Sequence, residues 1–194
     1  MKKIKKFRIS VRPSYFFRLL KNSVEIQKDE IEKQIQDNYS LISPCTLYES
    51  YKLEGLKNEE FRKAVESWAE GIEITPYSVV SLVIITIGGM IEKEIENLKD
   101  KDGRRQADIL EALGTEALQQ CHIFVTKLIQ KEAEEEDCIV NGLKKVPDAE
   151  LKNMVKLLDS RKIGVAYDKK TGLTPPKSVA FYAYWIPLKK KKRK

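Results

Sequence analysis

The fold of this 194-residue chain is decided by the stretch Ser78-Val-Val-Ser-Leu-Val-Ile-Ile-Thr-Ile87. Most of its residues are apolar and many are β-branched, a composition that favours a strand over a helix. Since apolar side chains occupy successive positions instead of alternate ones, we expect both faces of the strand to be buried. The stretch therefore predicts a buried strand at the centre of the core.

Two helices are predicted to follow this strand. Gly88-Gly89 turns the chain, and residues 90–98 then place their apolar side chains three, four and seven positions apart, on one face of a helix. A charged corner around Gly103 leads into a long helix, at about residues 104–135. Gly114 lies inside this helix, where it costs about 1 kcal/mol relative to alanine, and it therefore predicts close packing or a bend.

Alternating and helical patterns predict the remaining elements. The expected strands are at residues 3–11, 46–53, 72–74, 163–167 and 178–186, with a short extended piece at 138–143. The expected helices are at residues 15–21, 23–37 (with Val24 on its inner side), 58–68, and from Pro147 onward. The length favours a single domain, residues 1–188, followed by a basic disordered tail at residues 189–194.

The net charge of +7 and the pI of about 9.1 come from the ends of the chain. Residues 189–194 are all Lys or Arg, and without them the rest of the chain carries a formal charge of +1. A second basic cluster, which includes Lys6, lies within residues 2–8. A lysine run of this kind is typical of a solvated tail, which adds salt-sensitive affinity for phosphate but no sequence recognition. The distribution therefore argues against nucleic acid as the main partner.

The cysteines and the histidine exclude several kinds of site. Cys45, Cys121 and Cys138 are odd in number and form no CxxC pair, so neither a disulfide framework nor a zinc site is indicated. His122 is the only histidine, which excludes a histidine cluster, and a lone histidine on a helix is more often structural than catalytic. There is no signal peptide and no apolar run of bilayer length, so we expect a cytoplasmic protein without a membrane partner.

Two weaker signals concern ligands. Gly88-Gly89 lies between a strand and a helix, as a phosphate-binding turn does, but it lacks both GxGxxG and GK[ST] and is better explained as a tight turn. The aromatic residues of the last strand are suited to stack on a nucleobase, although core packing is the commoner role for them. Composition and spacing alone therefore do not specify a reaction.

Four segments taken together resemble the activation domain of cobalamin-dependent methionine synthase, in its stand-alone form. They are Val83-Ile-Ile-Thr-Ile-Gly-Gly89, Asp108-Ile-Leu-Glu-Ala-Leu-Gly-Thr-Glu-Ala-Leu118, Leu157-Leu-Asp-Ser-Arg-Lys-Ile-Gly-Val165 and Leu173-Thr-Pro-Pro-Lys-Ser-Val179. The family has a T-x-G turn after its buried strand, an A-L/I-G motif in its long helix, and then an "riGv" strand and a P-x-K/A-S-V-S strand. The resemblance covers roughly residues 40–185.

The resemblance implies an α+β fold, with a bent, mostly antiparallel sheet and helices packed around it. It also implies a role in methionine biosynthesis. Domains of this family bind S-adenosylmethionine and dock over the corrinoid of a partner enzyme when its cobalamin has been oxidised to cob(II)alamin. A flavodoxin-type reductant supplies an electron, and S-adenosylmethionine remethylates the cobalt. On this resemblance, the chain is an accessory to a methyltransferase, namely methionine synthase or another corrinoid protein.

The resemblance also places a cofactor pocket between the end of the long helix, the turn at residues 138–143 and the region of residues 175–179. Gln119 and Asn141 are expected to supply polar contacts, and Gly142 a close approach of the backbone. The expected cofactor-binding residues are Gln119, Asn141, Gly142, Leu143 and Pro175, with no catalytic residue and no metal ligand.

The sequence departs from the family pattern at three positions, two of which are among these five residues. The helix glutamate of the family is Gln119 here, and the arginine and tyrosine of its R-x-x-x-G-Y/F-P signature are Cys138 and Leu143, while Gly142 is kept. An arginine would hold a carboxylate bidentately, which a cysteine does not. An alternative is therefore a binding module of the same fold that has lost the S-adenosylmethionine site and acts through protein contacts. A third option is phosphate or nucleic-acid binding through the two basic ends.

Overall fold

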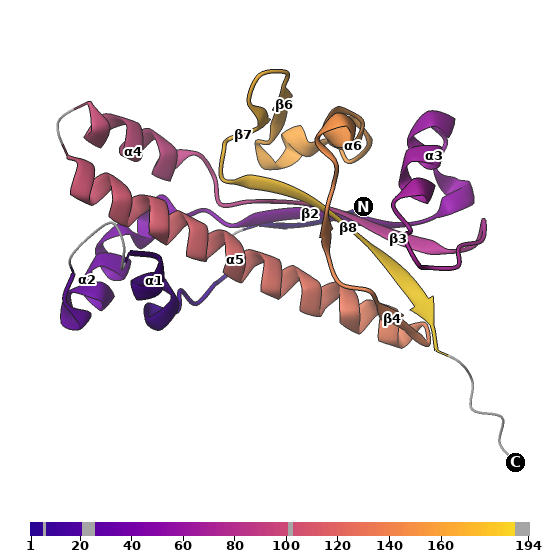
Figure 1. Ribbon diagram of the computed structural model, residues 1–194, viewed down its shortest axis with the longest axis horizontal. Coiled ribbons are helices and arrows are strands. Elements are labelled where there is room, and N and C mark those ends of the chain that lie inside the picture. Colours follow the sequence, from indigo (N-terminus) through magenta and orange to yellow (C-terminus); the bar gives the residue numbers. More distant parts are fainter. Residues whose placement is uncertain (6, 21–25, 101–102, 189–194) are drawn as a thin grey trace, which may run out of the picture.

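The computed structural model describes residues 1–5, 7–20, 26–100 and 103–188 (Figure 1). Three expectations fall outside this part of the chain: the basic tail at residues 189–194, Lys6 of the basic N-terminal cluster, and Val24 of the second helix.

The described residues form helices and strands in a mixed order along the chain. The helices are α1 (Pro13–Leu20), α2 (Lys28–Asn38), α3 (Glu59–Ser67), α4 (Met90–Lys99), α5 (Arg104–Glu135) and α6 (Leu151–Leu157). The strands are β1 (Lys2–Lys5), β2 (Cys45–Lys52), β3 (Val79–Thr86), β4 (Cys138–Val140), β5 (Lys144–Lys145), β6 (Ala166–Asp168), β7 (Gly172–Thr174) and β8 (Ser178–Pro187). Short 3-10 helices lie at Tyr39–Leu41, Leu53–Gly55, Asp148–Glu150 and Ser160–Ile163.

The sheet has the strand order β1-β2-β3-β8-β4, and β5 also pairs with β8. Every pairing between its strands is antiparallel, and β6 and β7 form a separate antiparallel hairpin. The predicted central strand is confirmed as β3, which lies between β2 and β8 and is buried from Val80 to Thr86. The α+β fold with a bent antiparallel sheet is confirmed as well.

Two hydrophobic clusters cover the two faces of the sheet, because successive side chains of a strand point to opposite faces. From β3, Val83 and Ile85 pack toward α1, α2, α4 and α5, whereas Leu82 and Ile84 pack toward α3, α6 and the β6–β7 hairpin. In Figure 1, α5 runs along one face of the sheet with α1 and α2 beside one end of it, while α3, α6 and the hairpin stand on the other side.

Gly114 is explained by the close packing of α5 against its neighbours. A Cβ at this position would lie 2.8 Å from Lys177 Cε and 3.3 Å from Ile91 Cδ1. The Lys177 side chain crosses α5 at Gly114 and ends at Glu111, where Nζ lies 2.5 Å from Oε1. Gly88 has a φ of +83°, which confirms the tight-turn interpretation of the diglycine.

Three strand predictions are corrected. The N-terminal strand ends at Lys5 and does not reach residue 11, because Lys5 pairs with Cys45, which is the first residue of β2. Residues 72–74 form no strand: Ile72 and Ile74 pack their side chains against the second cluster without joining the sheet. In the segment 163–167, the strand begins only at Ala166, and its partner is β7, which the sequence did not indicate.

Candidate functional site

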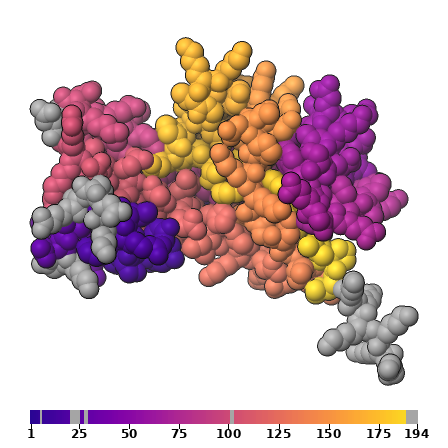
Figure 2. All heavy atoms as spheres, viewed as in Figure 1, coloured from indigo at the N-terminus to yellow at the C-terminus, as the bar shows by residue number. Residues whose placement is uncertain are grey.

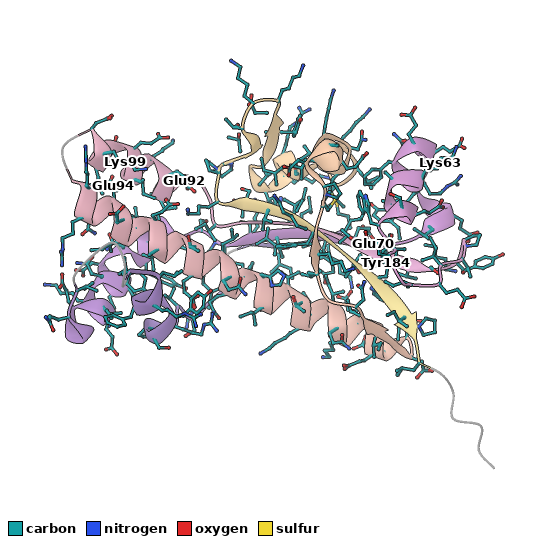
Figure 3. All side chains as sticks on the ribbon, viewed as in Figure 1. Lys63, Glu70, Glu92, Glu94, Lys99 and Tyr184 are labelled. Carbon is teal, nitrogen blue, oxygen red and sulfur yellow. The ribbon has the colours of Figure 1, made fainter. Side chains whose placement is uncertain are left out.

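The turn between β4 and β5 is held on β8 by Asn141. The Asn141 N–H donates to the Tyr184 carbonyl (3.1 Å), and the Tyr184 N–H donates to Asn141 Oδ1 (2.9 Å), so the side chain completes a pairing that the backbone begins. Tyr184 lies on the α3 side of β8 (Figure 3), where its hydroxyl donates to the Val65 carbonyl. Gly142 then turns the chain with a φ of +87°, and Leu143 packs against the cluster that faces α5.

Gln119 lies on α5, exposed, one turn before His122, so that both side chains belong to one stripe of the helix. The His122 ring contacts the Phe181 ring of β8, with 4.6 Å between centroids and 61° between planes. Burial lowers the pKa of His122, which keeps the imidazole neutral at pH 7. We use the name α5–β8 surface for Gln119, His122, Leu143 and Phe181.

Cys138, at the position of the family arginine, is the first residue of β4 and lies opposite Pro187. Its thiol donates to the Glu136 carbonyl (3.4 Å). Burial, together with the charges of Glu136 and Asp137, raises the pKa of this thiol, so it is neutral at pH 7 and a poor nucleophile.

Pro175 lies away from the turn. It packs against Gly89, with 3.3 Å between Pro175 Cβ and the position of a Cβ at Gly89. At about 3.3 Å per residue, the first paired residue of β8, Ser178, and Tyr184 are about 20 Å apart along the strand. The structure therefore brings Asn141, Gly142 and Leu143 together in the middle of β8, and leaves Pro175 at its beginning.

Replacing Gly142 with alanine is expected to lower the free energy of unfolding by about 1 kcal/mol, because L residues are strained at positive φ. No atom lies within 4 Å of a Cβ at Gly142, so crowding does not contribute to this cost. Gly55→Ala is the matched control, since its Cβ also meets nothing within 4 Å and its φ lies outside the strained range. Urea denaturation measures both variants, and an equal effect of the two would contradict the expectation.

A cleft of about 380 Å³ lies beside the first residues of β8. We call it the hairpin cleft, because one of its walls is the β6–β7 hairpin. It is lined by Lys145, Asp148, Leu151, Tyr167, Lys169, Lys170, Thr171, Gly172, Leu173, Pro176, Ser178, Val179 and Ala180. The cleft includes part of the region of residues 175–179 in which a pocket was expected, but none of the five expected binding residues lines it.

The sequence did not predict an ion pair between Arg12 and the buried Glu116 of α5. Glu116 is fully buried and accepts from Arg12 Nε (2.8 Å) and Nη2 (3.2 Å), from the Arg12 N–H (3.2 Å) and from Gln120 Nε2 (2.7 Å). The pair joins the start of α1 to the middle of α5. Glu116 lies next to Leu113 and Ala117 on the apolar face of the predicted helix, and this spacing was the signal that a partner cation was needed.

Within the described residues, no group of three or more His, Cys, Asp or Glu side chains is placed to hold a metal ion. The helices of this part of the chain also include none that combines the length and the apolarity needed to cross a membrane.

The sequence matches no protein-family model and no curated protein. Among solved structures, the fold is similar to a crystal structure of the MetH reactivation domain bound to AdoHcy. The alignment covers 98% of this chain and 79% of that one, with a TM-score of 0.60 and 10% sequence identity. At this identity the likeness establishes a shared fold.

Proposed function

We propose that this chain works as a stand-alone protein of the reactivation-domain type, which binds S-adenosylmethionine and supports the reductive remethylation of a cobalamin enzyme. The observation that carries the proposal is the fold likeness over 98% of the chain to a domain bound to AdoHcy. The four sequence segments that resemble the same family support it independently. In this role, residues 1–188 act as one domain in the cytoplasm.

The proposed site is the α5–β8 surface with the adjoining turn. Asn141 Oδ1 is used by the Tyr184 N–H, and no described residue accepts from Asn141 Nδ2, which is therefore the group offered to a ligand. Gln119 offers an exposed amide, and Gly142 has no side chain to keep a ligand from the backbone. The rings of His122 and Phe181 give the apolar contact that an adenine requires.

The chain's own contribution is binding and orientation. S-adenosylmethionine supplies a methyl group on a positively charged sulfur, and the acceptor cobalt belongs to the partner protein. Because His122 is neutral and Gln119 uncharged, neither of these two side chains places a positive charge beside this sulfur. A corrinoid protein and a flavodoxin-type reductant are the proposed partners, and methionine synthase is the first candidate for the corrinoid protein.

Gln119→Glu is expected to tighten S-adenosylmethionine binding about tenfold, because a carboxylate pairs with the ligand ammonium and a neutral amide only hydrogen-bonds to it. Gln119→Ala is expected to weaken binding about threefold to tenfold through the loss of one hydrogen bond. Lys127→Ala is the control, since it lowers the net charge by the same single unit from an exposed position of α5. Calorimetric titration measures all three, and equal affinities of the Gln119→Glu and Lys127→Ala variants would place the ligand elsewhere.

The alternative is a module of this fold that has lost the ligand and acts through protein contacts. Two observations favour it: Cys138 and Leu143 replace the arginine and tyrosine of the family signature, and Leu143 is packed against the core. The two functions differ in whether bound S-adenosylmethionine changes the affinity of this chain for its partner. A methionine synthase without its own reactivation domain is the test partner, and its affinity for this chain is measured with and without S-adenosylmethionine. An affinity that the ligand does not change supports the alternative.

A further inference from the structure

The hairpin cleft has a rigid apolar floor. Leu151, Leu173 and Ala180, which line it, are buried in the cluster between the sheet and α6. Tyr167 forms part of the wall and is half-buried, with its ring against the same cluster. The volume of about 380 Å³ lies within the range of about 300–1,000 Å³ that is typical of small-molecule sites. Figure 2 shows the hairpin standing out from the surface beside α6.

The lining of the cleft carries an excess of positive charge. Lys145, Lys169 and Lys170 contribute three ammonium groups against the single carboxylate of Asp148. Lys145 and Asp148 form an ion pair of 3.3 Å, but their side chains are 66% and 80% exposed, so the pair contributes little and opens readily. In the described part of the chain, neither Lys169 nor Lys170 forms an ion pair. These lysines are therefore available to an anion.

The turn that carries two of these lysines is fixed by Asp168. Its Oδ1 accepts from the Lys170 N–H (2.8 Å), the Thr171 N–H (2.9 Å) and the Thr171 hydroxyl (3.1 Å). These hydrogen bonds lower the pKa of Asp168, which stays ionised at neutral pH and holds the turn in one conformation. The carboxylate nearest to Lys169 and Lys170 in sequence is thus already engaged by the backbone.

The beginning of β8 turns an unused backbone edge toward the cleft. The Lys177 carbonyl accepts from the Ile87 N–H (3.2 Å), on the β3 side, and the Ala180 carbonyl accepts from the Val146 N–H (3.0 Å), on the opposite side. Because the direction of backbone groups alternates along a strand, the Ser178 N–H and carbonyl point away from β3, as those of Ala180 do. Ser178 lines the cleft, so its N–H is a donor at the cleft edge.

We infer that the hairpin cleft binds a small phosphorylated organic molecule of about the size of a mononucleotide. The three lysines and the Ser178 N–H receive the phosphate, and the apolar floor with Tyr167 receives the organic part. An added peptide strand fits less well, because Ala180 is already paired with Val146 and Pro176 has no N–H to offer. The inference does not depend on the proposed S-adenosylmethionine site, which uses other residues.

The probe is AMP, with adenosine and inorganic phosphate as its two parts. In amide-resolved NMR titrations, AMP is expected to shift the signals of Lys170, Thr171, Leu173 and Ser178, and to bind at least about tenfold more tightly than either part alone. Saturating S-adenosylmethionine, which carries no phosphate, is expected to leave this binding unchanged. Displacement of AMP by S-adenosylmethionine, or equal binding of AMP and phosphate, would overturn the inference.

The triple variant Lys145→Ala, Lys169→Ala, Lys170→Ala is expected to weaken AMP binding at least about tenfold, because the charge-assisted contacts are lost. The matched control is the triple variant Lys63→Ala, Lys93→Ala, Lys127→Ala, which removes the same charge from exposed positions outside the cleft. All six side chains are exposed, so both proteins should fold, and unchanged dispersion of the NMR spectra checks this. An equal loss of affinity in both variants, or no AMP binding at millimolar concentration by the unmodified chain, would refute the inference.

Discussion

Arg12→Ala is expected to lower the free energy of unfolding by about 3 kcal/mol at neutral pH. Removing one partner of a buried ion pair costs about 3–5 kcal/mol, since the other charge is left buried and uncompensated. The lower end of this range applies because the Arg12 side chain is 44% exposed and because Gln120 still donates to Glu116. Urea denaturation at pH 7 measures the loss.

Arg18→Ala is the matched control for this variant. The guanidinium groups of Arg12 and Arg18 both lie over the Tyr15 ring, at 4.6 Å and 4.4 Å from its centroid, but Arg12 alone pairs with Glu116. Loss of the ring contact is expected to cost about 0.5–1 kcal/mol. If Arg12→Ala costs no more than Arg18→Ala, the ion pair does not anchor α1 to α5.

The Arg12→Ala variant leaves the Glu116 carboxylate without its cation. Glu116 is fully buried, and a buried carboxylate without a cation costs more free energy than a buried neutral amide of the same shape. Adding Glu116→Gln to this variant is therefore expected to restore part of the stability, which urea denaturation at pH 7 measures.

Cys138→Arg is expected to tighten the binding of S-adenosylmethionine by about tenfold to a hundredfold. Hydrogen bonds to charged groups contribute about 1.5–3 kcal/mol each, and about 1.4 kcal/mol corresponds to a factor of ten in affinity. The guanidinium would restore the bidentate contact with the ligand carboxylate that the family signature provides. Calorimetric titration of the variant measures the gain.

Ile139→Arg is the control for the Cys138→Arg variant. Ile139 is the next residue of β4, and it is 41% exposed, so its side chain points to the other face of the strand and tolerates a charge. The Ile139→Arg variant therefore has the same added positive charge, but on the face of β4 that points away from the proposed site. Equal affinities of the two variants would show that position 138 does not face the ligand.

The fold was predictable from the sequence where local pattern and tertiary structure agree. The continuous apolar run of β3 required burial on both faces, and the helical spacing of α5 continued to Glu135 as expected. Gly114 signalled close packing, which Lys177 supplies from a segment 63 positions later. The strand predicted at residues 163–167 overlaps β6, but β7 was not predicted, because it is only three residues long and carries no alternating pattern long enough to identify.

The candidate site was predictable only in part. Asn141, Gly142 and Leu143 are consecutive in the sequence, so their proximity was predictable. The hydrogen bond between Asn141 and the Tyr184 backbone was not, because the two residues are 43 positions apart. Pro175 was grouped with them because the family resemblance implies a pocket at residues 175–179, but a sequence does not say at which point along a ten-residue strand a turn will dock. The burial of Glu116 was not predicted, because a single charged residue on a helix is usually solvated.

Calorimetric titration of the unmodified protein with S-adenosylmethionine, and with S-adenosylhomocysteine for comparison, tests the proposed function most directly. We expect saturable binding of S-adenosylmethionine in the micromolar range, since Gln119, Asn141 and the open backbone at Gly142 still offer a site. The absence of heat from either ligand at millimolar concentration would contradict it, and would leave a protein-binding module of this fold as the function to pursue.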